Sequence, residues 1–328
     1  MFNRRLSSYL VASSLFAVAL ITAVASSPIQ APAEAVPKAQ AASAPPRLNR
    51  PLPFGPGEVL TYNIAFSKLI FSGSIGQLKL TVKNGLQPAR NDSRPASDPS
   101  KGTRKPESET SKESSADPAQ VSRRATSVAT APSTIEFGAE VVSKGFFTWL
   151  FGIKIEDSYG AVVSSDDFGL SRCWKDIDQG DLHRRYETRV DREGGTVSYS
   201  ESDRKNPQSP KIKTGNCPRW VLDLLSAVYF IRTQELKEGS QISIPLTDVG
   251  QTYVIDVVPV KHEDVEVEAG RFKTLQLDLK IFDGKYIRRS GQLLVWLSDD
   301  ARQLPVRARV KSSGATVNIT LAHYERLG

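Results

Sequence analysis

The sequence predicts a mainly β fold: a strongly curved antiparallel sheet, or a partly open barrel, with one long buried helix at about residues 218–233. Two observations support this prediction. Apolar and polar residues alternate with a period of two in many runs of strand length, such as Leu275–Ile281, and turn signals such as Gly194-Gly195 separate these runs. One apolar run, Pro218–Thr233, is continuous and too long for a typical strand. We therefore expect a single β domain over residues 54–324.

The first 25 residues have the pattern of a secretory signal peptide. Arg4 and Arg5 precede an apolar run over residues 10–24, and Ala23-Val24-Ala25 fits the small-x-small cleavage pattern. An uncleaved N-terminal membrane anchor stays open as an alternative, although the apolar segment is at the short limit for spanning a bilayer. Both interpretations place the rest of the chain outside the cytoplasmic membrane, and we predict a periplasmic protein.

Two segments have compositions that do not support a packed core. Residues 26–53 are rich in Ala and Pro and are predicted to form a semi-extended tether. Residues 87–133 contain no aromatic residue, no Leu and no Ile, so burial cannot offset the entropy lost on ordering them. We expect a disordered insertion within the β domain, which acts as a solvated spacer or, alternatively, recruits a partner.

The expected strands are amphipathic, with one face buried and one face in contact with water. This pattern is typical of antiparallel strands in a sheet that covers a core on one side. The clearest alternating sets lie in residues 60–66, 78–82, 253–257, 275–281 and 317–321.

The apolar run predicts a helix that is buried over most of its surface. Pro218 suits a first helical position, and Gly239 can end the element soon after the run. At 100° per residue its few polar side chains, including Asp223 and Ser226, fall in one narrow stripe, while Arg232 lies on roughly the opposite side. We expect the helix to lie in the concave side of the sheet.

Several motifs, taken in order along the chain, resemble the bacterial domain of unknown function 3108 family. They lie in Phe54–Tyr62, Ile70–Leu80, Asp223–Arg232, Val267–Thr274, Val295–Asp300 and Leu304–Val306. The resemblance spans about residues 54–324, apart from the 87–133 insertion. It implies an exported, mostly antiparallel β domain of the bacterial envelope, and it implies no reaction.

The basic character of the chain does not indicate nucleic-acid binding. Residues 1–25, 26–50 and 87–133 each contribute +2 to the formal net charge of +7, which leaves +1 for everything else. A nucleic-acid binder concentrates positive charge on its fold or in a dense arm. We therefore expect no nucleic-acid partner.

The only two cysteines, Cys173 and Cys217, are a candidate disulfide, because the predicted compartment is oxidising. A bridge would close a loop of about 45 residues and would stabilise the fold by about 4 kcal/mol in the chain-entropy model. Two separate, largely buried thiols are the alternative. Their spacing is not that of a thiol–disulfide catalyst.

No catalytic or metal-binding motif is present, so we predict no catalytic residue, no metal and no cofactor, and we favour a non-enzymatic protein over an enzyme. The three histidines, at positions 183, 262 and 323, have no metal-ligand spacing. The acidic pairs Asp166-Asp167 and Asp299-Asp300 lie beside turn residues, where Asp bonds the local backbone.

A few residues are candidates for binding a ligand. Arg232, at the end of an apolar helix, needs an anionic or carbonyl partner. This partner is Asp299 or another acid in the core. Alternatively, it is the anionic headgroup of a bound ligand. In the second case Tyr229 and Trp296 would line the pocket. The apolar stretch Phe146–Ile153 is interpreted as packed on the core or, alternatively, as a mobile lip or membrane-contacting patch.

These features favour a non-enzymatic periplasmic protein that binds an apolar or amphipathic lipid or glycan component of the envelope in its curved sheet. One alternative is an envelope assembly module that reaches a protein partner through its loop and tether. A second alternative is an unrecognised hydrolase of envelope polymers, which requires two polar catalytic groups to converge in a cleft.

Overall fold

The computed structural model describes residues 51–69, 71–84, 133–145, 148, 152–282, 287 and 290–326. The predicted signal peptide, nearly all of the predicted tether and nearly all of the 87–133 insertion lie outside the described residues, as does most of the apolar stretch 146–153. Those predictions therefore remain predictions.

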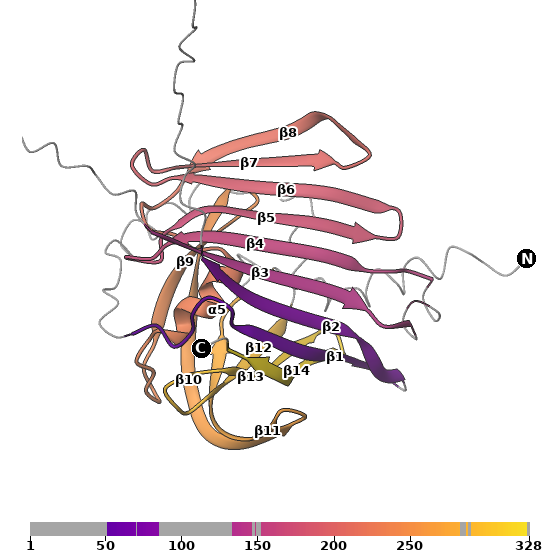
Figure 1. Cartoon of the computed structure of the whole chain (residues 1–328), viewed down its shortest axis with the longest axis vertical. Helices are drawn as coiled ribbons and strands as arrows, with labels where there is room; N and C mark the ends of the chain where they lie inside the picture. Colours follow the sequence, from indigo (N-terminus) through magenta and orange to yellow (C-terminus); the bar gives the residue numbers. More distant parts are fainter. Residues whose placement is uncertain are drawn as a thin grey trace, which may run out of the picture. The chain divides into compact units, whose positions relative to one another are not determined.

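The described residues form fourteen named strands and one named helix (Figure 1). The first eight strands are β1 (Val59–Lys68), β2 (Phe71–Asn84), β3 (Thr134–Ser143), β4 (Glu156–Ser164), β5 (Leu170–Gln179), β6 (Leu182–Asp191), β7 (Thr196–Asp203) and β8 (Asn206–Asn216). Helix α5 (Leu224–Arg232) follows them. The remaining strands are β9 (Ile242–Asp248), β10 (Gln251–Val267), β11 (Gly270–Leu279), β12 (Gly291–Ser298), β13 (Pro305–Ser312) and β14 (Ala315–Glu325).

All fourteen strands belong to one antiparallel sheet, in the order β8-β7-β6-β5-β4-β3-β2-β1-β14-β13-β12-β11-β10-β9. The first strand, β1, lies in the middle of the sheet, and successive hairpins lead outward from it to β8 at one edge. The chain then crosses through α5 to β9 at the other edge, and hairpins lead back to β14 beside β1. Strands β8 and β9 do not pair, so the sheet is not closed. The prediction of a mainly β, curved and partly open sheet is confirmed.

The helix begins later than the sequence predicts, at Leu224 rather than near Pro218. Asp223 is the N-cap: its carboxylate accepts hydrogen bonds from the backbone N–H groups of Leu225 and Ser226, and the Ser226 hydroxyl in turn accepts from the Asp223 N–H. The residues before the cap are held by β9 instead, because the Leu222 N–H donates to the Pro245 carbonyl at 3.0 Å. The predicted start at Pro218 is wrong, since contacts with β9 keep these residues out of the helix.

One face of the sheet carries the core, as the alternation predicts. Leu60, Tyr62, Ile64 and Phe66 of β1 are all buried, and their neighbours in sequence are not. We call the face that carries these residues the inner face and the opposite face the outer face. Helix α5 contacts β3, β4 and β9 on the inner face, so it occupies one end of it (Figure 1).

The two edges of the sheet approach each other on the inner face without pairing. The turn between β9 and β10 packs on β7 and β8, where an added Cβ on Gly215 would lie 2.7 Å from the Gly250 carbonyl oxygen. The Lys175 ammonium of β5 lies 2.8 Å from the Asp248 carboxylate at the end of β9.

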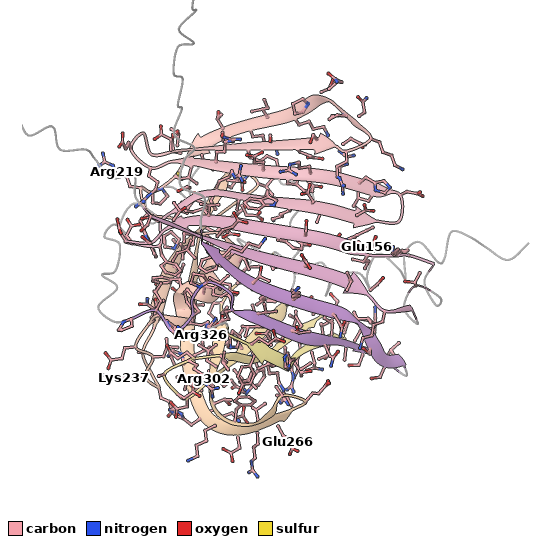
Figure 2. All side chains as sticks on the ribbon, in the orientation of Figure 1. Glu156, Arg219, Lys237, Glu266, Arg302 and Arg326 are labelled. Atoms are coloured by element: carbon pink, nitrogen blue, oxygen red, sulfur yellow. The ribbon has the colours of Figure 1, made fainter. Side chains whose placement is uncertain are left out.

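Charged side chains such as Arg219, Lys237 and Glu266 lie at the periphery of the described structure (Figure 2). Within the described residues, no helix is both long enough and apolar enough to cross a membrane.

Candidate functional site

The Arg232 guanidinium, predicted to need an anionic partner, has a bidentate one inside the core. Its two terminal nitrogens, Nη1 and Nη2, donate to Oε1 and Oε2 of Glu58 at 2.6 and 2.9 Å. Nη2 also donates to the Arg302 carbonyl at 3.2 Å. The Arg232 side chain is 0% exposed. The partner is therefore the core acid Glu58 rather than Asp299, and the ion pair has no open side that faces solvent.

Tyr229 lies in a closely packed group of aromatic rings beside this ion pair. Its ring stacks on Phe137 with a centroid distance of 4.0 Å and contacts Phe54 edge to face at 5.1 Å. The hydroxyls of Tyr62 and Tyr229 are buried without a hydrogen-bond partner among the described residues. Burial raises the pKa of both phenols, so both stay protonated and neutral. This end of the inner face is packed core.

Trp296 lies on the outer face, away from Tyr229 and Arg232. Its indole N–H donates to the Glu263 carboxylate at 2.6 Å, and this hydrogen bond is the main cause that lowers the Glu263 pKa. The Arg307 and Arg309 guanidiniums lie 5.7 and 5.3 Å from the centroid of the Trp296 ring. These neighbours leave the residue only 2% exposed. The three residues predicted to bind a ligand therefore do not form one site in the structure.

Cys173 and Cys217 are free thiols in the structure, so the predicted disulfide is not formed. In the sheet register Cys173 lies level with Lys213, three strands away, and Cys217 lies four residues farther along the chain. Three strand spacings are about 14 Å, whereas a disulfide needs Cα atoms within about 7 Å. Burial raises the pKa of both thiols, that of Cys217 to about 11, which makes each a poor nucleophile.

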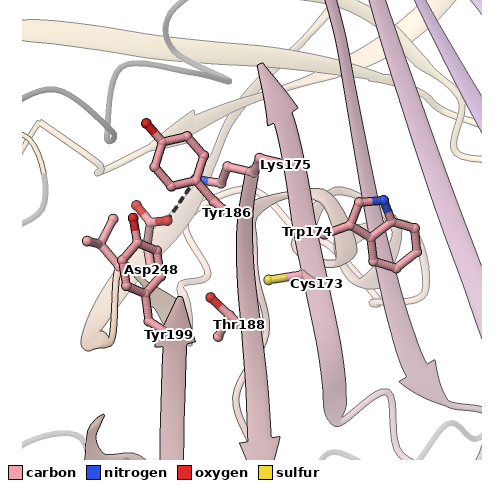
Figure 3. A pocket seen from close by; sticks show the side chains of 8 residues that line it. Cys173, Trp174, Lys175, Tyr186, Thr188, Tyr199 and Asp248 are labelled. Atoms are coloured by element: carbon pink, nitrogen blue, oxygen red, sulfur yellow. Dashed lines mark hydrogen bonds and ion pairs between the residues drawn. The ribbon is translucent and has the colours of Figure 1, made fainter. Parts of the chain in front are cut away.

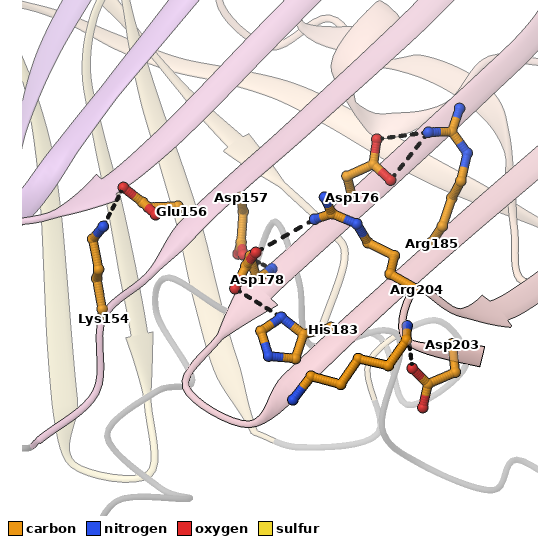
Figure 4. Close-up of polar contacts among 10 residues, drawn as sticks. Lys154, Glu156, Asp157, Asp176, Asp178, His183, Arg185, Asp203 and Arg204 are labelled. Atoms are coloured by element: carbon orange, nitrogen blue, oxygen red, sulfur yellow. Dashed lines mark hydrogen bonds and ion pairs between the residues drawn. The ribbon is translucent and has the colours of Figure 1, made fainter. Parts of the chain in front are cut away.

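The histidines lie apart from one another, each beside a carboxylate of its own. His183 Nδ1 is 3.0 Å from Asp178, which also accepts from Arg204 (Figure 4). His262 contacts Asp299, and His323 contacts Glu325. No group of three or more His, Cys, Asp or Glu side chains that could hold a metal ion occurs in the part of the chain that the structure describes.

The acidic pairs act in turns, as predicted. The Asp167 carboxylate accepts from the Gly169 N–H at 2.9 Å, and the Asp300 carboxylate accepts from the Arg302 N–H at 2.9 Å. Both are local bonds to the backbone two residues later, which is the pattern of an Asx turn.

A small cavity lies under the turn between β9 and β10 (Figure 3). Its volume is about 10 Å³, which is about the space that one water molecule needs. Burial alone would lower the Lys175 pKa, but the Asp248 carboxylate, together with smaller contributions from Cys173 and Asp223, raises it overall, so the ammonium stays charged. The cavity lining consists of Cys173, Trp174, Lys175, Tyr186, Thr188, Tyr199, Asp248 and Val249. It is too small for an organic ligand and contains no activated nucleophile.

The inner face is incompletely covered across three neighbouring strands. Val295 of β12, Ala308 of β13 and Ile319 of β14 are directly opposite one another in the register, and all three are half-buried. We call these three residues the inner row. Each lies between two buried residues of its own strand: Leu293 and Leu297, Val306 and Val310, and Val317 and Leu321.

The inner row is bounded on both sides by closed packing. Leu277 pairs with Val295 at one end, Ile64 pairs with Ile319 at the other, and both are buried. With strands about 4.8 Å apart, the row is about 10 Å wide. Sequence reasoning missed it, because its residues have the same apolar alternation as their buried neighbours. It is the one part of the described inner face where three adjacent apolar side chains remain partly accessible.

The proteins found in comparisons with known proteins are described without a function. The chain is similar in structure to a beta-barrel-like protein of the domain of unknown function DUF1849 from Brucella abortus, with 8% identity, a TM-score of 0.44, and coverage of 84% of this chain and 99% of that chain. It is also similar to a protein with a YmcC-like fold from Bacteroides fragilis NCTC 9343, with 9% identity, a TM-score of 0.32, and coverage of 84% and 98%.

No curated protein matches the chain. A family model does match it, over residues 116–322, which is well over half of the 328 residues. The matched family is described as protein of unknown function DUF3108. The chain belongs to the DUF3108 family.

Proposed function

We propose that the protein is an exported, non-enzymatic binding protein that holds the apolar part of an envelope lipid against the inner row. The observation that carries this proposal is the row itself: Val295, Ala308 and Ile319 are apolar, adjacent and half-buried, and the residues that flank them on the inner face are buried. An apolar ligand that covers them removes this surface from water, which is favourable.

The chemistry of the row favours an acyl chain over a glycan. Its side chains are two branched aliphatics and a methyl group, with no ring to stack on a sugar and no donor or acceptor to orient a hydroxyl. Burial of one methylene is worth about 0.8 kcal/mol, so enough covered methylenes are needed to exceed the free energy that association costs. A ligand with one long chain meets that requirement.

The other end of the inner face does not support ligand binding. Arg232 is paired with Glu58, and Tyr229 is stacked on Phe137, so no headgroup has access to either. We do not propose a hydrolase, because the histidines and acids of the described residues do not converge in a cleft. The assembly alternative depends on the loop and the tether, which lie outside the described residues.

The binding proposal is tested with a fluorescent fatty acid, dansyl-undecanoic acid, and two matched variants. Ala308→Phe fills the inner row, and Thr320→Phe places the same ring on the outer face of the neighbouring strand. We expect the parent protein and Thr320→Phe to bind the probe with micromolar affinity, and Ala308→Phe to bind it at least tenfold more weakly. A parent protein that does not bind the probe, or equal binding by both variants, would overturn the proposal.

The location in the envelope is tested separately. Intact-mass measurement of protein purified from its own envelope should show loss of the first 25 residues if the signal peptide is cleaved. A full-length mass in the membrane fraction would support the N-terminal anchor instead, and recovery from the cytoplasm would contradict export. Lipid extraction of the same material should release a long-chain lipid in a near-stoichiometric amount.

A further inference from the structure

The two edges of the sheet are protected to different extents. At the β9 edge, Leu222 forms a parallel bridge with Leu246, and the Thr247 N–H donates to the Leu222 carbonyl at 2.8 Å. The segment before α5 therefore covers that edge. At the other edge, β8 pairs with β7 alone, and no described segment pairs with its free side. All residues of β8 are exposed except the half-buried Gly215.

The free side of β8 presents backbone groups that are ready to pair with another strand. The Cys217 N–H donates to the Gly195 carbonyl of the β7 side at 2.9 Å. Bonded residues alternate along an antiparallel ladder, so Gly215, Lys213 and Lys211 also direct their backbone groups to β7. The N–H and C=O groups of Ile212, Thr214 and Asn216 then point outward.

Prolines protect only the first half of this strand. Pro207 and Pro210 lie in a bulge, where the register moves from the pair Asp203–Asn206 to the pair Glu201–Lys211. Proline on an edge strand prevents pairing because it has no N–H. Residues 211–216 contain no proline, so this half of the edge keeps all its donors.

The positive charges of residues 211–216 favour an acidic partner. Lys211 and Lys213 lie on one face of β8, opposite Glu201 and Tyr199 in the register, and neither ammonium has an ion-pair partner among the described residues. The acid opposite Lys211 in the register, Glu201, is already bound by Arg184 at 2.9 Å. β8 itself contains no acid. On its other face Ile212 is 67% exposed.

We propose that residues 211–216 of β8 are a docking edge for an extended segment of a partner protein that carries acidic residues at alternate positions. The partner strand would pair with the outward backbone groups, place its acids beside Lys211 and Lys213, and place apolar side chains beside Ile212. A second copy of this chain is a poorer fit, because antiparallel pairing of two β8 edges brings like charges together. This inference is independent of the proposed function.

The test uses two fluorescein-labelled heptapeptides and measures fluorescence anisotropy with the full-length protein. The acidic peptide is Thr-Glu-Val-Glu-Val-Glu-Thr, and the basic peptide has Lys in place of each Glu. Thr214→Pro removes one outward N–H without touching the ladder to β7, and Gln208→Pro is the matched control within the bulge that already contains prolines. Loss of one or two hydrogen bonds, at about 1 kcal/mol each, corresponds to about tenfold weaker binding.

We expect the acidic peptide to bind, Thr214→Pro to weaken that binding about tenfold, and Gln208→Pro to leave it unchanged. The double variant Lys211→Glu/Lys213→Glu should bind the basic peptide more tightly than the acidic one. This reversal of preference tests the proposal even if Thr214→Pro does not fold. No binding of the acidic peptide, equal binding of both peptides, or a dimer that excludes the peptide would each overturn the proposal. The dimer outcome, seen by sedimentation, would make a second copy the occupant.

Discussion

The two ends of the inner face have the same alternating sequence pattern but different degrees of packing. Around α5, the rings of Phe54, Phe137 and Tyr229 and the ion pair of Arg232 with Glu58 are buried. Across β12, β13 and β14, the inner row stays half-buried. The charged residue at the end of the apolar helix is therefore paired inside the core, and incomplete burial of ordinary aliphatic residues is the feature on which the proposed binding site depends.

The largest expected effect lies at the packed end. Arg232→Met removes the cation and leaves the Glu58 carboxylate buried without its partner, which should lower the free energy of unfolding by about 3–5 kcal/mol. Guanidinium chloride denaturation measures this change. The double variant Glu58→Gln/Arg232→Met also removes the stranded charge and should recover a large part of the loss. A loss below about 1 kcal/mol in the single variant would show that this end is open to water.

The partner of Arg232 illustrates what the sequence can and cannot predict. A buried cation requires a partner, and the sequence analysis anticipated a core acid. It did not identify Glu58, which lies 174 residues away. One signal was available: Glu58 has the same alternation phase as Leu60 and Tyr62, which places an acid on the apolar face. An acid in that phase is a marker for a buried ion pair.

Other features could not be predicted because they depend on contacts between distant segments. Trp296 lies in a strand that is apolar on both faces, so alternation does not tell which face it occupies. The inner row has the same residue types as its buried flanks, and only the arrangement of the covering elements distinguishes it. The alternation was sufficient for the fold class, since it depends on each strand alone.

A smaller effect is expected at the start of α5, which positions the packed end. Asp223→Ala removes the N-cap acceptor for the Leu225 and Ser226 N–H groups and should cost about 1 kcal/mol. Asp223→Asn keeps a capping oxygen and should cost much less. Thermal unfolding of the two variants gives the comparison. Equal losses would mean that the negative charge, rather than the hydrogen bonds, sets the contribution of this residue.

The pH dependence of stability probes the far end of β4, away from α5. Asp157 is 2% exposed and accepts hydrogen bonds from the Asp178 N–H at 2.9 Å and from Gln179 Nε2 at 2.6 Å. Burial raises its pKa above the ordinary 3.8, and the hydrogen bonds oppose this shift without cancelling it. The folded state therefore binds this proton more tightly than the unfolded state, and the stabilisation is lost as the pH rises through the folded pKa.

Asp157→Asn isolates this contribution, because the amide has no proton to lose. We expect the unfolding free energy of the parent protein to fall relative to that of the variant as the pH rises from about 3 towards neutrality. Urea denaturation at several pH values measures this difference. The opposite slope would show that the hydrogen bonds outweigh burial and lower the pKa.

The smallest expected effect is that of a larger side chain at Ala308, and it bears most directly on the comparison. Ala161 and Ala308 are both alanines on the inner face: Ala161 is 0% exposed and pairs in register with Phe137, whereas Ala308 is the middle of the inner row. Leucine at position 161 overfills a packed region and should cost about 1–3 kcal/mol. Leucine at position 308 enters unfilled space and should change the unfolding free energy by less than about 0.5 kcal/mol.

The same pair of variants also separates packing from ligand binding. A saturating fatty acid stabilises only a protein that binds it, so the probe should raise the melting temperature of Ala161→Leu but not that of Ala308→Leu. If leucine at position 308 costs as much as leucine at position 161, the inner row is packed like the rest of the core. The lipid proposal would then lose the observation on which it depends, and the open edge of β8 would be the surface left to explain.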